Sequence, residues 1–143
     1  MKYDFTSATI KFCAIGFFIP GFTAIVFFGF QLIFEKSGVR CDTFWHYLWA
    51  LTTITALISP CIFIRNIKKT NNPTLFKLNL FNITEYMSLQ ICLARFFTNE
   101  SIICYESGGQ NGLELAFTAW IALPILVCLS YVFEKKLKIE KVN

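Results

Sequence analysis

The sequence predicts an all-α integral membrane bundle of four transmembrane helices, with both termini cytoplasmic. Of its 143 residues, 55% are hydrophobic and 15% are charged, whereas a soluble domain has about 25% charged residues. The chain also contains four apolar runs, each near the roughly 20 residues that a helix needs to cross a hydrocarbon core. Residues 1–143 are therefore expected to form a single membrane domain with no separate soluble part.

The first predicted span covers residues 10–34. This run is longer than the 7 to 15 or so apolar residues of a signal peptide, and no small-residue cleavage site follows it, so we expect it to stay in the membrane. Pro20 and Gly21 interrupt it. Because proline removes a backbone hydrogen bond, the helix is predicted to be kinked or loosened there.

The second predicted span covers residues 44–64 and opens with aromatic residues typical of the membrane interface. His46 lies among them and is interpreted as a headgroup-level residue, because no acidic or cysteine partner is adjacent in sequence. Hydroxyl side chains follow at helical spacing before Pro60. They are predicted to bond to carbonyls or to another helix.

The third and fourth predicted spans cover residues 78–98 and 113–133, and residues 134–143 form a charged tail. Residues 65–77 form a basic connection between the second and third spans. Positive residues stay on the cytoplasmic side of short loops. Ten Lys and Arg residues fall on the side of the two termini, two fall on the other side, and Arg95 lies within the third span. Both termini are therefore predicted to be cytoplasmic.

This topology places Cys41 and Cys104 in the two outer loops, which in a bacterium face the oxidising periplasm. We therefore predict that they form a disulfide. The other four cysteines fall within spans and are interpreted as packing residues. Membrane thiol oxidoreductases also use cysteines in outer loops, but they need a redox pair close in sequence. A structural bridge is favoured, and a thiol enzyme stays an alternative.

The third span carries a polar stripe formed by Asn82, Glu85, Ser88, Cys92 and Arg95, because a helix turns about 100° per residue. The opposite side is predicted to hold Ile83, Tyr86, Met87, Ala94 and Phe97.

Ionisable groups inside a membrane are costly and are functional candidates by default. Arg95 is expected near the outer end, where Glu114 of the next helix could pair with it. Glu85 lies deeper and could be met by Arg65, by the threonine stripe of the second span or by a group on another protein. We predict that Asn82, Glu85, Ser88 and Arg95 contact another protein, although helix-to-helix contacts within the bundle remain an alternative for them.

Several function classes find no support in the sequence. The chain has a net charge of +4, but its basic residues are not interleaved with aromatic residues as a nucleic-acid-binding surface would require. No nucleic-acid partner is therefore expected. A Cys-x-x-Cys motif is absent, and the only histidine has no nearby cysteine, so no metal site is predicted. No catalytic constellation and no cofactor are predicted either.

Residues 52–81 resemble the pore-forming colicin immunity proteins of the three-helix type. The similarity rests on a hydroxyl-rich span that ends in proline, a basic connection and the opening of the next span. The residues that carry it are Thr52, Thr53, Thr55, Ser59, Pro60, Asn71, Asn72, Pro73, Lys77, Leu78, Asn79, Leu80 and Phe81. This chain departs from the family in its shorter basic connection and its fourth span.

The resemblance implies a protein of the bacterial inner membrane that binds the membrane-inserted helices of a toxin before its channel opens. The sequence is accordingly interpreted as a small multi-pass membrane protein that binds another membrane protein, with immunity or exclusion as the concrete form. The alternatives are a membrane thiol-disulfide oxidoreductase and an accessory subunit of a transporter or envelope complex. The expected partners are a membrane protein or toxin helices, and the lipid bilayer.

Overall fold

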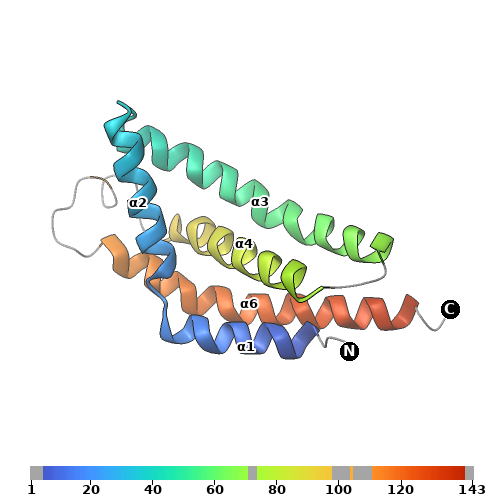
Figure 1. The fold of residues 1–143 in the computed structure, drawn as a ribbon. Helices are drawn as coiled ribbons and strands as arrows, with labels where there is room; N and C mark the ends of the chain where they lie inside the picture. The colour runs from blue at the N-terminus through green and yellow to red at the C-terminus, as the bar shows by residue number, and fades with distance from the viewer. Residues whose placement is uncertain (1–4, 71–73, 98–103, 105–110, 141–143) are drawn as a thin grey trace.

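The computed structural model describes residues 5–70, 74–97, 104 and 111–140, and their regular secondary structure is helical, with no β-strand among them. The all-α prediction is therefore confirmed (Figure 1). The helices are α1 (Phe5–Phe18), α2 (Phe22–Lys36), α3 (Cys41–Thr70), α4 (Leu75–Ala94) and α6 (Asn111–Glu140).

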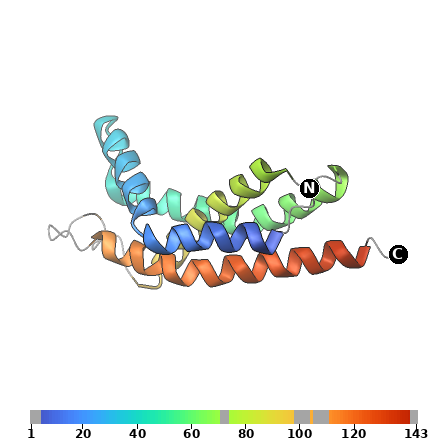
Figure 2. The same cartoon turned by 60° about the horizontal axis from the view of Figure 1, so that its bottom comes forward.

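Four of the helices, α1, α3, α4 and α6, run lengthwise along the bundle, and α2 crosses it near one end (Figure 1). α3 and α6 run in the same direction, whereas α4 runs in the opposite direction between them. The start of α1, the end of α3, the start of α4 and the end of α6 all lie at the same end of the bundle (Figures 1 and 2). We call this the basic end, because it carries Arg65, Lys68, Lys69 and Lys77.

Two helices, α3 and α6, are long and apolar enough to cross a membrane, and the bent pair α1–α2 makes a third if it counts as one broken span. The chain is thus a membrane protein by the length and composition of its helices. α4 is not among these candidates. Its 20 residues would reach about 30 Å, but polar residues, including Lys77, Asn79, Glu85 and Gln90, interrupt its apolar character.

The first predicted span is two helices rather than one. α1 ends at Phe18, α2 begins at Phe22, and their axes differ by 69°. The predicted kink at Pro20 and Gly21 is confirmed, and it is a complete break. Proline has no N–H to give to the Gly16 carbonyl, which instead accepts the Ile19 N–H at 3.2 Å.

The indole of Trp120 on α6 lies beside the same break. Its Nε1–H donates to the Phe17 carbonyl at 3.4 Å, so one of the carbonyls at the end of α1 receives a donor from a neighbouring helix. Gly16 lies in the last turn of α1, where a Cβ would come within 3.2 Å of the Leu123 side chain. α1 therefore packs closely against α6.

Two apolar clusters hold the bundle. Towards the basic end, Phe63 of α3 stacks on Phe81 of α4 with ring centroids 4.2 Å apart, and Phe133 of α6 packs against both rings. At the other end, Phe27 of α2 packs edge-on against Trp45 of α3. Burying such aromatic side chains supplies much of the packing energy of a small bundle.

The helices extend beyond the predicted spans. α3 continues to Thr70 and α6 to Glu140, because polar residues in the last turns do not end a helix that the membrane segment has already started. α4 begins at a capped end, where the Thr74 hydroxyl accepts the Lys77 N–H at 3.3 Å. Such caps satisfy one of the free N–H groups at a helix start.

Candidate functional site

α4 packs against α1, α3 and α6, and its buried positions fall on more than one face. The buried residues of α4 are Leu78, Phe81, Asn82, Glu85, Tyr86, Ser88, Gln90, Ile91 and Ala94. Four of them are polar and almost completely shielded, with exposed fractions of 0% for Asn82, 1% for Glu85, 4% for Ser88 and 0% for Gln90. We call these four residues the α4 polar core.

Asn82, Tyr86 and Gln90 are spaced by four residues and so share one face of α4. The Thr9 hydroxyl of α1 donates to Asn82 Oδ1 at 3.4 Å. The Tyr86 ring packs edge-on against Phe12 of α1, with centroids 5.7 Å apart. This face of α4 therefore points towards α1.

Glu85 points to a different neighbour, α3. The Ser59 hydroxyl, just before Pro60, lies next to the Glu85 carboxyl group. The other carboxyl oxygen, Oε2, has no hydrogen-bond partner within the described residues. Within that part of the chain the only ion pair joins Arg40 and Asp42, so no described basic side chain neutralises Glu85 by direct contact.

Further polar atoms of α4 lack partners within the described part of the chain. The Asn82 Nδ2 group and both amide atoms of Gln90 make no hydrogen bond there. The Tyr86 hydroxyl lies next to the Gln90 amide, but no hydrogen bond of good geometry joins them. A buried polar group left without a partner costs about 1–3 kcal/mol, so the α4 polar core is an expensive feature of the bundle.

Arg95 lies at the carboxyl end of α4 with its side chain exposed. Its guanidinium carbon is 5.0 Å from the centroid of the Trp49 ring of α3, which is within the range of a cation–π contact. The side chain of Glu114, the predicted ion-pair partner, lies outside the described residues. The Arg95–Glu114 pair therefore stays a prediction.

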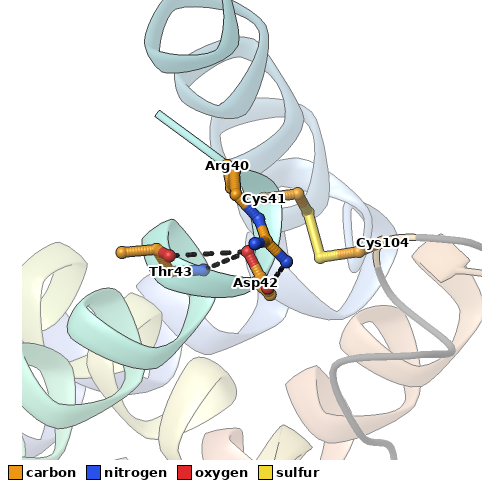
Figure 3. A network of polar contacts seen from close by, with 5 residues as sticks. All are labelled: Arg40, Cys41, Asp42, Thr43 and Cys104. Carbon is orange, nitrogen blue, oxygen red and sulfur yellow. Dashed lines mark hydrogen bonds and ion pairs between the residues drawn. A yellow bond between two sulfur atoms is a disulfide. The ribbon is translucent and has the colours of Figure 1, made fainter. Parts of the chain in front are cut away.

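The predicted disulfide is present. Cys41, the first residue of α3, is bonded to Cys104 with 5.8 Å between the Cα atoms (Figure 3). Beside it, Arg40 pairs with Asp42 at 2.6 Å, and Asp42 also accepts the Thr43 N–H at 2.8 Å. The bond ties the start of α3 to the segment between α4 and α6.

The four remaining cysteines, Cys13, Cys61, Cys92 and Cys128, are free thiols on helices α1, α3, α4 and α6. Within the described residues, no three His, Cys, Asp or Glu side chains gather as a metal site would require. The α4 polar core itself contains one carboxyl group and neutral amides and hydroxyls. Such a set can accept and donate hydrogen bonds, but it offers no second acid or base for catalysis.

Three of the four residues predicted to contact a partner, Asn82, Glu85 and Ser88, lie inside the bundle, and the fourth, Arg95, lies at its surface. The sequence-based stripe did not include Gln90, and it placed Tyr86 on the apolar side. The spacing Asn82, Tyr86, Gln90 could have revealed a second polar row.

No protein-family model, no curated protein and no solved structure matches this chain.

Proposed function

We propose that this protein is a multi-pass protein of the bacterial inner membrane that acts by binding another membrane protein, most concretely as an immunity or exclusion protein against a pore-forming toxin. The observation that carries the proposal is the buried Glu85 carboxyl group, which lies under α3, a helix with no fully buried residue along its middle. A polar group at that depth is costly, and recognition between membrane helices is a use that justifies such a cost.

The direction of the helices supports four crossings. α3 and α6 run the same way and lie side by side with α4 (Figure 1). If both cross the membrane in the same direction, the chain must cross back between them, and α4 is the helix that does so. The same reasoning applies to α1 and α2, which lead from the basic end to the start of α3 at the opposite end. α4 tolerates its polar residues because other helices surround it.

The cover over Glu85 is α3, and the fully buried residues of this helix lie near its ends. Phe44 and Trp45 are buried at one end and Phe63 and Ile67 at the other, whereas no residue from His46 to Ile62 is buried. One side of the middle of α3 is therefore open to lipid or another membrane protein. A partner helix that displaced it would meet Glu85 Oε2, which accepts no hydrogen bond within the described residues.

The test is survival of bacteria under challenge with a panel of pore-forming toxins. Cells that express the wild-type chain are expected to survive at least one of them, and cells that express Glu85→Gln are expected to lose this protection at an equal amount of membrane-inserted protein. Ser130→Ala is the matched control, because Ser130 is also buried but its hydroxyl bonds to the Val127 carbonyl of its own helix. Unchanged sensitivity to every toxin in the panel would contradict the proposal.

The same assay distinguishes partner binding from the alternative of a thiol enzyme. A double substitution of Cys41 and Cys104 by serine removes the disulfide but leaves Glu85 in place. Protection that survives this change, while Glu85→Gln abolishes it, supports partner binding. Protection that depends on the cysteines and not on Glu85 would instead favour redox chemistry at the disulfide. An accessory-subunit role would appear as a transporter or envelope complex that co-purifies without any toxin.

A further inference from the structure

The break between α1 and α2 lies against α4. Gly16 is in the last turn of α1, and a Cβ placed there would lie 3.6 Å from the Tyr86 hydroxyl oxygen. Beyond the break, Ala24 of α2 belongs to the same apolar cluster as Ile91 of α4. α1 and α4 both start at the basic end and so run in the same direction (Figures 1 and 2). Gln90 lies between these two contacts on α4 and is therefore level with the break.

Three side chains at this level end in polar atoms that are buried and make no hydrogen bond within the described residues. Tyr86 and Gln90 on α4 are 3% and 0% exposed, and Thr23 on the first turn of α2 is 0% exposed. The atoms are the two hydroxyl oxygens and both amide atoms of Gln90. An unpaired buried polar group costs about 1–3 kcal/mol. Three such side chains at one level indicate that they share a partner.

The break adds backbone groups to the same place. The last four carbonyls of a helix have no donor within it, and Pro20 has no N–H to offer. At the end of α1, the Gly16 carbonyl accepts the Ile19 N–H, and the Phe17 carbonyl accepts the Trp120 indole. The other two carbonyls of that turn receive no donor from outside the helix in the part of the chain that the structure describes. Ordered water is one of the groups that supply such bonds at membrane depth.

The unpaired groups include both donors and acceptors, and this mixture decides what the site can hold. Gln90 offers an NH₂ donor and a carbonyl acceptor, the hydroxyl groups of Tyr86 and Thr23 can do either, and the end of α1 offers carbonyls. A metal ion would leave the Gln90 donor unused, and an anion would leave the carbonyls unused. Water both donates and accepts, and a buried water makes about three hydrogen bonds to groups of this kind.

We propose that ordered water binds at the α1–α2 break, where it bridges the Tyr86 hydroxyl, the Gln90 amide and the Thr23 hydroxyl. Such a bridge explains why Tyr86 and Gln90 lie next to each other without a direct hydrogen bond. It also gives the broken span hydrogen bonds that the chain itself does not supply. The inference does not depend on Glu85, which points towards α3, or on any protein partner.

The test is X-ray hydroxyl-radical footprinting of the purified full chain in lipid nanodiscs, with oxidised residues identified by mass spectrometry. Radicals formed from a bound water oxidise the side chains that touch it. Tyr86 is therefore expected to be oxidised although it is buried, and a radical scavenger in the bulk solution should not protect it. Phe81 is also buried but stacks on Phe63 in an apolar cluster, so it is expected to stay unmodified.

Two substitutions remove parts of the site. Gln90→Leu takes away a donor and an acceptor from a water that makes about three hydrogen bonds, so Tyr86 oxidation should fall at least about threefold. Thr23→Val keeps the side-chain shape and should lower the oxidation by a smaller factor. The matched control is Gln31→Leu, the same change on α2 away from the break, and it should leave Tyr86 oxidation unchanged. Formation of the Cys41–Cys104 disulfide in each variant checks that the bundle has folded.

Several outcomes would overturn the proposal. An unmodified Tyr86 in the wild type would mean that Tyr86 and Gln90 bond to each other directly. Oxidation that the scavenger suppresses would mean that radicals reach Tyr86 from bulk water when the helices separate. Equal oxidation in the wild type, Gln90→Leu and Thr23→Val would show that these side chains do not hold the water. Ordering a water costs up to about 2 kcal/mol, so the site adds little net stability, and oxidation is the more direct measurement.

Discussion

α4 and α6 lie against each other, yet they handle buried polar side chains in opposite ways. In α6 the hydroxyl groups of Thr118 and Ser130 are buried, and each donates at 2.8 Å to a carbonyl of the preceding turn of its own helix. In α4 the Glu85 Oε2 atom and both amide atoms of Gln90 are buried and make no hydrogen bond within the described residues. The hydroxyl groups of α6 are therefore satisfied within their own helix, whereas these polar groups of α4 are shielded by neighbouring helices without being satisfied by them.

This difference separates a helix that can cross a membrane alone from one that cannot. α6 has the length and apolar character of a free-standing span, and its hydroxyl groups cost little because they bond locally. α4 has adequate length but needs other helices around it, because a lipid-exposed carboxyl or amide group would be far more costly. The comparison can be tested by placing a polar side chain in α6, by placing an apolar side chain in α4 and by removing single contacts.

The largest effect is expected when a polar group is placed in α6. Leu126 is fully buried, and Leu126→Asn both leaves a cavity and buries an amide without a partner. The free energy of unfolding should fall by at least about 3 kcal/mol, as measured by denaturant titration in mixed micelles. Leu126→Met keeps the volume and serves as the control, with a loss below about 1.5 kcal/mol. A similar small loss for both variants would show that α6 accepts polar groups as α4 does.

The next effect concerns the disulfide that clamps the segment between α4 and α6 to α3. Cys41 and Cys104 are 63 residues apart in sequence, so reducing the bond, or replacing either cysteine by serine, frees a long loop in the unfolded chain. The expected loss of unfolding free energy is about 2–4 kcal/mol. Alkylation of membranes before and after reduction checks the premise. Both thiols reacting without reductant would refute the bridge.

A smaller effect distinguishes contacts between helices from contacts within one helix. Thr9→Val removes the donor to Asn82 Oδ1 and leaves a buried acceptor unpaired, at a cost of about 1–3 kcal/mol. Thr118→Val removes only a bond to a carbonyl of its own helix, so we expect a loss below about 0.5 kcal/mol. The measurement is again the denaturant midpoint of the full chain. Equal losses would mean that α4 does not depend on α1 in this way.

The smallest effect is expected when α4 is made more like α6. Gln90→Leu replaces a fully buried amide, which makes no hydrogen bond within the described residues, by an apolar side chain of similar size. The unfolding free energy should stay within about 1 kcal/mol of the wild type or rise above it. A larger loss would indicate that the Gln90 amide contributes a hydrogen bond in solution. The Leu126→Asn variant, measured in parallel, makes the opposite change, because it places an amide in α6 where Gln90→Leu removes one from α4.

Sequence patterns predicted the helical class, a kink at Pro20 and Gly21 and the pairing of Cys41 with Cys104. Each of these follows from a local rule or from loop charge. The size of the bend was not predictable, because it depends on packing of α2 against α3 and α6. The position of Trp120 over the end of α1 likewise depends on tertiary contacts.

The α4 polar core was predicted only in part. Glu85 stood out as a charge inside an apolar run, and Asn82 and Ser88 followed from helical spacing. Tyr86 and Gln90 did not, because a single polar stripe assumes that a helix has one buried face. α4 has neighbours on several sides, so its polar residues point in more than one direction. A one-face pattern cannot describe such a helix.

The first and last helices of the chain are joined by hydrogen bonds from Thr6, whose backbone N–H and hydroxyl both donate to the Glu134 carboxylate. The carboxylate thus acts as a cap for the start of α1, supplied by a residue 128 positions later. During synthesis α1 leaves the ribosome early, but its cap and its packing surface on α6 are made much later. Insertion can proceed helix by helix, whereas closure of this part of the bundle has to wait until Glu134 on α6 has been translated.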